Sequence, residues 1–199
     1  MDKQYKLILF DYNGTLVNTP FVDKNPLHIL PGRREKLAEL RSQGIFLGVC
    51  TNQAGPLWHM ATSQDKFPSA LYVAQELNHM MIQLSWVTPI QSDPWYIALY
   101  DSRAMGILNG LYEQQKIVEP GEILISLQKE MQSFMARSNV WIGIDKDWRK
   151  PNPGMLTFAR NQAEVEASET LYVGDLPDDE LAAKNAGCDF IWADQFFGD

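Results

Sequence analysis

The sequence predicts an α/β fold built around one doubly wound, mainly parallel sheet. Short apolar runs, typical of buried strands, alternate along the chain with stretches whose apolar residues recur every three or four positions, as in amphipathic helices. The first elements follow the order strand, helix, strand, which favours a parallel crossover. Because the chain has 199 residues, 45% of them apolar, it is long enough for one substantial core, and we expect a single domain over residues 1–199.

Each element is predicted from its apolar pattern and its flanking turn residues. Gly44 and Gly187 are typical helix C-terminal stops, and Asn152 and Pro153 are expected to be the N-cap and first position of a helix. The expected strands are 5–10, 45–50, 95–100, 140–144, 171–174 and 190–192. The expected helices are 34–44, 67–86, 121–137, 153–162 and 177–187. The predicted buried face of the second helix consists of Leu71, Ala74, Leu77, Met81 and Leu84.

Composition and charge argue against several classes of partner. The formal net charge of −8 disfavours a surface for nucleic acid or anionic lipid, whose phosphates would be repelled. The N-terminal apolar run is too short for a signal peptide, and no stretch approaches the roughly 20 apolar residues that span a bilayer. We therefore expect a cytoplasmic protein with no membrane partner. Cys50 and Cys188 lie far apart in apolar contexts, which favours reduced core thiols over a disulfide or a zinc cluster.

Four polar motifs occur in order along the chain, and at least three of them end or follow a predicted strand. They are Asp11 in FDYNGTL, Thr51 in GVCTNQ, Lys150 in WRKPNPGM, and Asp175 with Asp179 in YVGDLPDDE. The carboxyl ends of parallel strands meet at one edge of a sheet, where α/β proteins bind ligands. We therefore expect these side chains, although distant in sequence, to share one pocket.

The motifs contain the groups that phosphoryl transfer requires. Asp11 is a candidate nucleophile, Thr51 supplies a hydroxyl and Lys150 a fixed cation. The remaining carboxylates can hold a hard divalent ion, and Mg²⁺ prefers a few carboxylates, a backbone carbonyl and water in octahedral geometry. The set therefore predicts Mg²⁺-assisted phosphoryl transfer through an aspartyl-phosphate.

In this order and on these elements, the four motifs resemble those of the haloacid dehalogenase superfamily of aspartate-dependent phosphotransferases. The resemblance covers most of the chain and implies a Rossmann-like core. The segments TNQAG after the second strand and RKPNPGM at the third motif are most similar to those of the subclass IIIA enzymes. That subclass includes histidinol-phosphate phosphatase, heptose-bisphosphate phosphatase and polynucleotide 3′-phosphatase.

The resemblance implies a role for each matching residue. Asp11 would be the nucleophile and a metal ligand, and Asp175 would hold Mg²⁺. Thr51, with Asn52 beside it, would bind phosphoryl oxygens. Lys150 would pair with the nucleophile and with the phosphate.

Three charged residues close in sequence to Asp175 or Lys150 each have two possible roles. Asp179 matches a further acidic position of the family, where it would bind the metal through water or orient Lys150. Asp178 is adjacent and could be confused with it, although a charge in the first turn of a helix is the simpler explanation. Arg149 is either a second cation for the substrate or an exposed arginine.

Asn13 departs from the family pattern. The family's phosphatases generally carry an aspartate here, which acts as general acid to the leaving oxygen and then as general base for water. An amide cannot exchange a proton at neutral pH, and loss of a positioned acid or base typically costs about 10² to 10⁴ in rate. The backbone carbonyl of Asn13 would still bind the metal. Other members carry different residues here, so Asn13 is also compatible with altered chemistry or with an engineered substitution that traps the intermediate.

Two further departures concern zinc and an insertion. The zinc-binding cysteines and histidine of some subclass members are missing, and His28, His59 and His79 lack ligand-like spacing, so no structural zinc is predicted. The chain between the second and third motifs is longer than the simplest capless members need. Residues 101–120 are the predicted surplus, as a small cover over the pocket, a surface elaboration or a subunit interface.

The sequence thus predicts a Mg²⁺-dependent phosphatase that hydrolyses a small phosphorylated metabolite through an aspartyl-phosphate on Asp11. A second hypothesis is a binding protein on the same scaffold, which keeps Mg²⁺ and phosphate affinity but has lost turnover through Asn13. Polynucleotide ends fit the acidic balance less well. A dehalogenase would need no metal, so the presence of both Asp175 and Asp179 counts against it. The sequence does not indicate an oligomeric state.

Overall fold

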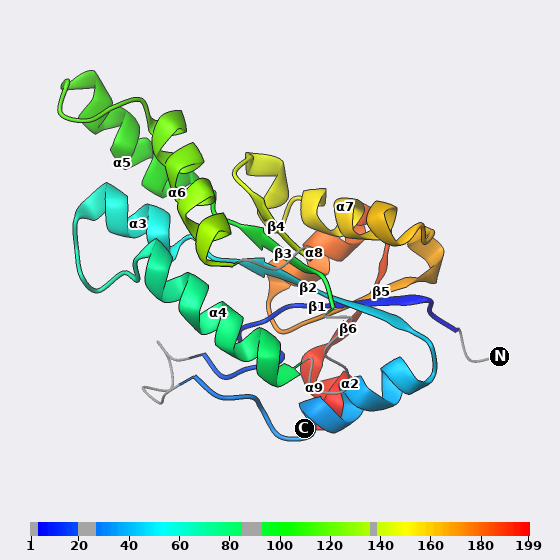
Figure 1. The fold of residues 1–199 in the computed structure, drawn as a ribbon. Helices are drawn as coiled ribbons and strands as arrows, with labels where there is room; N and C mark the ends of the chain where they lie inside the picture. The colour runs from blue at the N-terminus through cyan, green and yellow to red at the C-terminus, as the bar shows by residue number, and fades with distance from the viewer. Residues whose placement is uncertain (1–3, 20–26, 85–92, 136–138) are drawn as a thin grey trace.

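The computed structural model describes residues 4–19, 27–84, 93–135 and 139–199. Within these ranges, six parallel strands form one sheet in the order β4-β3-β2-β1-β5-β6 (Figure 1). The strands are β1 (Leu7–Phe10), β2 (Phe46–Asn52), β3 (Trp95–Ala98), β4 (Val140–Gly143), β5 (Thr170–Gly174) and β6 (Asp189–Trp192). The predicted α/β class and parallel sheet are confirmed. The strand order reverses at β1, because the chain builds outward to β4 and then returns to the other side of β1.

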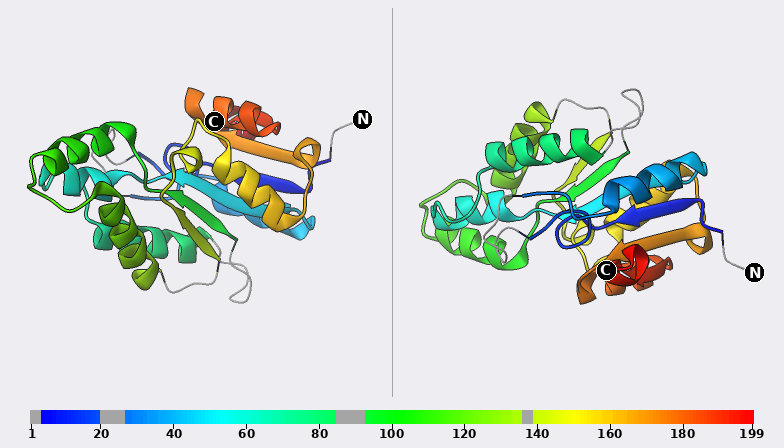
Figure 2. Two further views of the ribbon diagram at one scale, coloured as in Figure 1. Left: turned by 90° about the horizontal axis from the view of Figure 1, so that it is seen from above. Right: turned by 90° about the horizontal axis from the view of Figure 1, so that it is seen from below.

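Helices cover both faces of this sheet, as the views from above and below show (Figure 2). One hydrophobic cluster lies between the sheet and α2, α4, α6 and α9, and a second lies between the sheet and α7 and α8. The helices are α2 (Arg33–Ser42), α3 (Gly55–Thr62), α4 (Ala70–Leu84), α5 (Ser102–Glu113), α6 (Pro120–Phe134), α7 (Gly154–Ala163), α8 (Pro177–Ala186) and α9 (Ala193–Phe197). The sheet is therefore doubly wound.

Strand β1 is the centre of the fold. It is hydrogen-bonded to β2 on one edge and to β5 on the other. Leu7 and Leu9 belong to the cluster beneath α7 and α8, whereas Ile8 and Phe10 belong to the opposite cluster, and all four are buried. Burial of both faces explains why this strand is a continuous apolar run rather than an alternating one.

Most predicted elements are confirmed to within a few residues, but two boundaries are wrong. Strand β2 continues to Asn52, so Thr51 lies inside the strand and not after it. Helix α7 begins at Gly154 with Pro153 as its N-cap, and Asn152 does not cap it. The Asn152 side chain instead donates to the Lys146 carbonyl at 3.1 Å, which closes the preceding turn.

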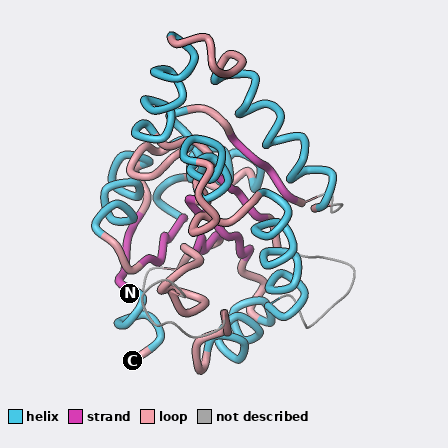
Figure 3. Tube along the Cα trace, turned by 90° about the vertical axis from the view of Figure 1, so that its left-hand side faces the viewer, coloured by secondary structure: helices cyan, strands magenta, loops and turns pink. Residues whose placement is uncertain are grey.

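Three helices were not predicted: α9, which follows β6, and the pair α3 and α5. Helix α3 follows β2 directly, and α5 occupies most of the 101–120 stretch. The two pack against each other beyond the carboxyl ends of the strands, which face the viewer in Figure 3. Asp101 begins α5 as its N-cap, since its Oδ1 accepts hydrogen bonds from the backbone N–H groups of Arg103 and Ala104 at 3.0 and 3.1 Å. The last residues of the predicted helices 67–86 and 121–137 lie outside the described residues.

Helix α4 buries a different stripe from the one expected. Ala74, Leu77, Met81 and Leu84 are buried as predicted, but Leu71 is 39% exposed. The stripe is completed by Ala70, Val73 and Met80. At 100° per residue the buried positions span one side of the helix, and Leu71 falls beyond the edge of that arc.

Both cysteines are buried and unbridged, as predicted. Across the described ranges, no helix combines the length and apolar character needed to cross a bilayer.

The two leucines of α4 give a matched test of this packing. We expect Leu77→Ala to lower the free energy of unfolding by about 2–5 kcal/mol, because it leaves a cavity in the main core. Leu71→Ala, made in the same helix, should cost less than about 1 kcal/mol, because its side chain already contacts solvent. Urea denaturation followed by tryptophan fluorescence measures both. Equal losses would show that the packing of α4 is wrongly assigned.

Candidate active site

The strand register brings the predicted motifs to one edge of the sheet. Phe10, the last residue of β1, is level with Val49 of β2 and Val173 of β5. Asp11 and Asp175 therefore leave adjacent strands almost side by side. The third motif reaches the same edge through the turn that follows β4 and the short 3₁₀ helix η1 (Lys146–Trp148).

The Lys150 ammonium lies at the centre of this site and is almost fully buried, with 4% of its side chain exposed. Its Nζ donates to Oδ1 of Asp11 at 2.5 Å, to Oδ1 of Asp179 at 2.6 Å and to the hydroxyl of Tyr172 at 2.9 Å. An ammonium has three N–H donors, so each has a partner. Burial alone lowers the pKa of Lys150, but the two carboxylates outweigh burial and raise the pKa above its usual value.

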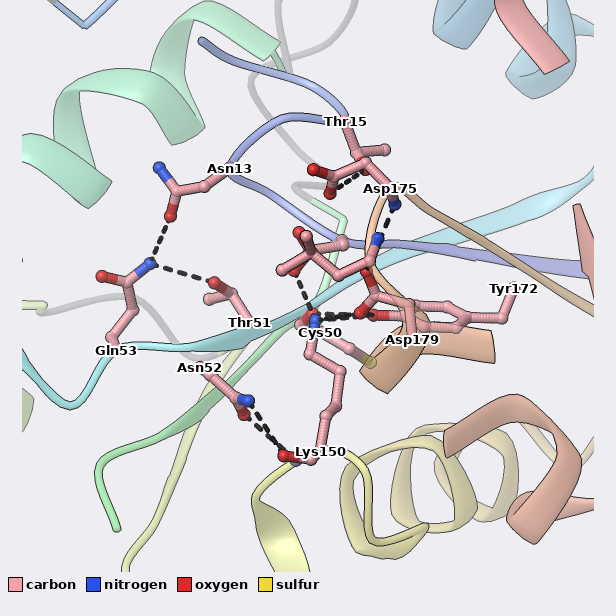
Figure 4. A network of polar contacts seen from close by, with 12 residues as sticks. Asn13, Thr15, Cys50, Thr51, Asn52, Gln53, Lys150, Tyr172, Asp175 and Asp179 are labelled. Carbon is pink, nitrogen blue, oxygen red and sulfur yellow. Dashed lines mark hydrogen bonds and ion pairs between the residues drawn. The ribbon is translucent and has the colours of Figure 1, made fainter. Parts of the chain in front are cut away.

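Each carboxylate oxygen of Asp179 accepts two hydrogen bonds from the protein. While Oδ1 accepts from Lys150 and from Tyr172, Oδ2 accepts from the backbone N–H groups of Asp175 and Leu176 at 3.2 and 3.0 Å (Figure 4). The side chain lies against Gly174, where a Cβ atom would approach Asp179 to 2.5 Å. These contacts fix the Asp179 carboxylate beside the Lys150 ammonium. The adjacent Asp178 is exposed in the first turn of α8.

Asp175 is positioned by the loop that follows Asp11. The Thr15 hydroxyl donates to Oδ1 of Asp175 at 3.2 Å. Gly14 has a φ of +83°, and a Cβ atom there would lie 2.1 Å from Oδ2 of Asp175. Any other residue at position 14 would therefore strain the backbone and displace the carboxylate.

Three carboxylates lie close enough together to hold a divalent cation. Asp11, Asp175 and Asp179 each offer an oxygen, and these oxygens lie within 4.8 Å of one another. Lys150 balances one of the three negative charges, which leaves the cluster with an excess that a divalent ion would neutralise. Burial raises the pKa of Asp11 to about 7, with Lys150 opposing the shift and Asp179 adding to it. Burial and the charge of Asp179 also raise the pKa of Asp175. A bound cation would favour the ionised form of both.

Asn13 and Thr51 are linked by a residue that the sequence did not single out. Nε2 of Gln53 donates to Oδ1 of Asn13 at 2.9 Å and to Oγ1 of Thr51 at 3.0 Å (Figure 4). This contact fixes the amide of Asn13, with its oxygen turned toward Gln53. Thr51 is buried at the end of β2.

Asn52 and Arg149 contact protein groups in the structure. Asn52 Nδ2 donates to the carbonyl of Lys150 at 3.2 Å, and its Oδ1 accepts from the Lys150 backbone N–H at 3.1 Å. This reciprocal pair fixes the third motif to the end of β2. Arg149 forms an ion pair with Asp101 at 3.1 Å and donates to the Tyr100 carbonyl at 3.1 Å. Phosphate binding by Asn52 and Arg149 remains a prediction.

Three contributors to the site escaped the sequence analysis: Thr15, Gln53 and Tyr172. All three lie within the quoted motifs, and Thr15 and Gln53 could have been found there as polar residues near strand ends. Tyr172 lies inside β5, where an aromatic residue is expected simply to pack. Its only sequence signal is a hydroxyl in a strand that is buried along its whole length.

Comparisons with known proteins support the resemblance to a family. A family model described as "haloacid dehalogenase-like hydrolase" matches residues 126–193, which include Lys150, Asp175 and Asp179. Phosphoglycolate phosphatase 1 of Pseudomonas aeruginosa is 28% identical over 191 residues, which are 92% of this chain and 66% of that protein. This chain thus spans just under two thirds of the relative's length.

Two further similar proteins are heptose-bisphosphate phosphatases. The D-glycero-D-manno-heptose-1,7-bisphosphate 7-phosphatase of Thermosynechococcus vestitus is 44% identical over 52 residues, 26% of each chain. The D,D-heptose 1,7-bisphosphate phosphatase of B. bronchiseptica, crystallised with magnesium and phosphate, aligns with 93% of this chain and 78% of its own. Its sequence identity is 20% and its TM-score is 0.46.

The sequence comparisons confirm the resemblance to haloacid dehalogenase-like hydrolases. They do not confirm subclass IIIA specifically, because the curated relatives include both phosphoglycolate and heptose-bisphosphate phosphatases.

Adjacent aspartates of α8 test the assignment of Asp179. In Asp179→Asn, an amide NH₂ group replaces one of the two carboxylate oxygens. This N–H donor would then face another donor, either the Lys150 ammonium or the backbone N–H groups of Asp175 and Leu176. We expect a loss of about 1–3 kcal/mol in the free energy of unfolding. The matched variant Asp178→Asn should cost no more than about 1 kcal/mol, the usual value of a first-turn charge. Chemical denaturation of the metal-free proteins measures both, and a larger loss for Asp178→Asn would contradict the assignment.

Proposed function

We propose that this haloacid dehalogenase-like chain is a Mg²⁺-dependent phosphatase that hydrolyses a small phosphorylated metabolite through an aspartyl-phosphate on Asp11. The observation that carries the proposal is the buried contact between the Asp11 carboxylate and the Lys150 ammonium, with Asp175 beside them at the carboxyl edge of the sheet. Named phosphatases among the similar proteins support the reaction class.

The nucleophile is Asp11. A carboxylate oxygen of Asp11 would attack the phosphorus of a phosphomonoester, the bond from phosphorus to the ester oxygen would break, and the alcohol would leave. Water would then attack the phosphoryl group and return the free carboxylate and inorganic phosphate. Lys150 would stabilise the charge on the transferring group while remaining paired with Asp179, and the Thr51 hydroxyl would donate to a phosphoryl oxygen.

Mg²⁺ would be held by Asp11, by Asp175 and by the backbone carbonyl of Asn13. When bound, it would supply positive charge that draws the phosphate toward the carboxylate cluster. Asp179 suits the alternative of orienting Lys150 better than it suits binding the metal, because both of its oxygens already accept two hydrogen bonds. The ligand set would therefore contain two carboxylates, in keeping with the few that Mg²⁺ prefers.

Asn13 limits the rate in this proposal. Its amide cannot act as a general acid or base near neutral pH, so the leaving alcohol and the hydrolytic water would have to exchange protons with solvent. The contact with Gln53, which also donates to Thr51, supports a place for Asn13 beside Thr51. The second candidate function, phosphate capture with little turnover, rests on this same residue.

The substrate is proposed to be small and anionic. The relatives are named for phosphoglycolate and heptose bisphosphate, and the net charge of −8 disfavours polynucleotides. We infer that residues 101–120 form a small cover, because α5 packs on α3, which begins two residues after Gln53. Arg149 lies at the base of this cover through its ion pair with Asp101, where it could meet a second anionic group of the substrate.

Substitution of residue 13 separates a slow phosphatase from a binding protein. With Mg²⁺ and a panel of small phosphomonoesters, we expect Asn13→Asp to raise the rate of phosphate release by about 10² to 10⁴, because it supplies the missing acid and base. Asp11→Asn, made in the original chain, should reduce release to background. If all three proteins are inert although circular dichroism shows them folded, the hydrolase proposal is wrong.

A second measurement addresses the intermediate directly. After exposure of the original chain to a reactive phosphoryl donor, mass spectrometry should find one added phosphoryl group on Asp11. Persistent labelling with little phosphate release would favour the second candidate function. A label on another residue would contradict the assignment of the nucleophile.

Substitutions of Asp175 and Asp178 test whether Asp175 is a Mg²⁺ ligand. We expect Asp175→Asn to weaken Mg²⁺ binding by at least about tenfold, since loss of a group that merely orients a ligand already costs about 10–100-fold. Asp178→Asn should bind Mg²⁺ like the unaltered chain. Isothermal titration calorimetry measures both affinities without turnover, and equal binding by the two variants would rule out Asp175 as a ligand.

A further inference from the structure

Arg33 is a buried cation outside the catalytic cluster. It is the first residue of α2, and it is 2% exposed. Its guanidinium donates through Nε to the Thr15 carbonyl at 3.1 Å and through Nη1 to the Pro31 carbonyl at 3.0 Å. Nη1 also donates to Oδ1 of Asp199 at 2.7 Å, and Nη2 donates to Oδ2 of the same carboxylate. Asp199 thus binds the guanidinium in bidentate fashion, which is the strongest geometry for this pair.

The C-terminal segment closes over Arg33. The Phe197 ring lies 4.2 Å from the guanidinium carbon of Arg33. Phe196 and Phe197 also pack on Phe10, with ring centroids 5.7 and 6.1 Å apart. Phe10 immediately precedes Asp11, so residues 193–199 contact both the end of β1 and the cation beside the following loop.

The other side of Arg33 faces the loop that carries the proposed metal site. Residues 12–17 form a tight turn in which the N–H groups of Leu16 and Val17 donate to the Tyr12 carbonyl at 2.9 and 3.0 Å. Within this turn, Thr15 accepts from Arg33 through its carbonyl and donates to Asp175 through its hydroxyl. A continuous chain of polar contacts therefore runs from Asp199 through Arg33 and Thr15 to Asp175.

We propose that Asp199 and Arg33 are positioning residues, which hold Thr15 so that its hydroxyl keeps Asp175 oriented for cation binding. A buried guanidinium requires a nearby anion, and in the described residues Asp199 is the carboxylate paired with it. Without Asp199 the guanidinium would turn toward solvent, and Nε would leave the Thr15 carbonyl. The inference rests on the proposed function only in naming Mg²⁺ as the cation.

Removal of the Asp199 carboxylate tests this chain of contacts. We expect Asp199→Ala to weaken Mg²⁺ binding about tenfold in calorimetry, the lower end of the effect of losing a group that orients a ligand. Hydrogen exchange of the metal-free protein should become faster in the peptide that covers residues 12–17. Glu169→Ala is the matched control, because it removes a carboxylate from the ion pair with Lys6 at the amino-terminal ends of β1 and β5. It should change neither measurement.

A double-mutant cycle separates positioning from general destabilisation. Thr15→Val removes the hydroxyl that contacts Asp175. If Asp199 acts through Thr15, Asp199→Ala should weaken Mg²⁺ binding much less when Thr15→Val is already present. Asp199→Asn, which can still accept one hydrogen bond, should fall between Asp199→Ala and the unaltered chain, and it provides a folded comparison if Asp199→Ala unfolds.

Several results would overturn the inference. These are unchanged Mg²⁺ affinity with unchanged exchange over residues 12–17, additive effects of the two substitutions, or an acceleration of exchange spread evenly over the whole chain. If the unaltered chain binds no Mg²⁺ and releases no phosphate, the proposed function fails. The exchange measurement then still decides whether Asp199 and Arg33 hold the loop.

Discussion

The burial of the Lys150 ammonium is the constraint on which the rest of the site depends. A charged lysine inside a protein is stable only where opposite charge is close and its N–H groups have acceptors. Asp11, Asp179 and Tyr172 meet these requirements from β1, α8 and β5 respectively. The sheet must therefore place β1 beside β5, and the loop after β4 must cross to them. The strand order with its reversal at β1 is the arrangement that does both.

The carboxylates around Lys150 are of two kinds, which differ in how many hydrogen bonds they accept from the protein. Asp179 is buried and saturated with hydrogen bonds, so its negative charge is committed to Lys150 and to the backbone. Asp11 and Asp175 lie at the end of their strands, where each is held from one side. The two kinds also differ in their partners: Asp179 contacts the Lys150 ammonium, whereas Asp175 accepts from the Thr15 hydroxyl.

The sequence predicted the groups at strand ends better than the contacts that orient them. Asp11 and Asp175 follow buried strands, and that position alone placed them at one edge. The contact between the Asn52 amide and the backbone of Lys150 was not predicted, because it depends on a loop whose path no local pattern encodes. Tyr172 was hidden because its strand position indicates packing. Leu71 was misassigned because the arc of α4 that meets the core is set by its neighbours.

The position of β1 between β2 and β5 has a consequence for how the chain acquires its structure. Strands β1, β2 and β3 come early in the sequence, but the partner for the other edge of β1 is β5, which begins at Thr170. A growing chain that has completed only its first three strands would expose an unpaired central strand made of four apolar residues. Such an edge invites pairing with a second chain. The free edge of β1 becomes paired only when β5 forms, within residues 170–199. The same 30 residues contain Asp175 and Asp179.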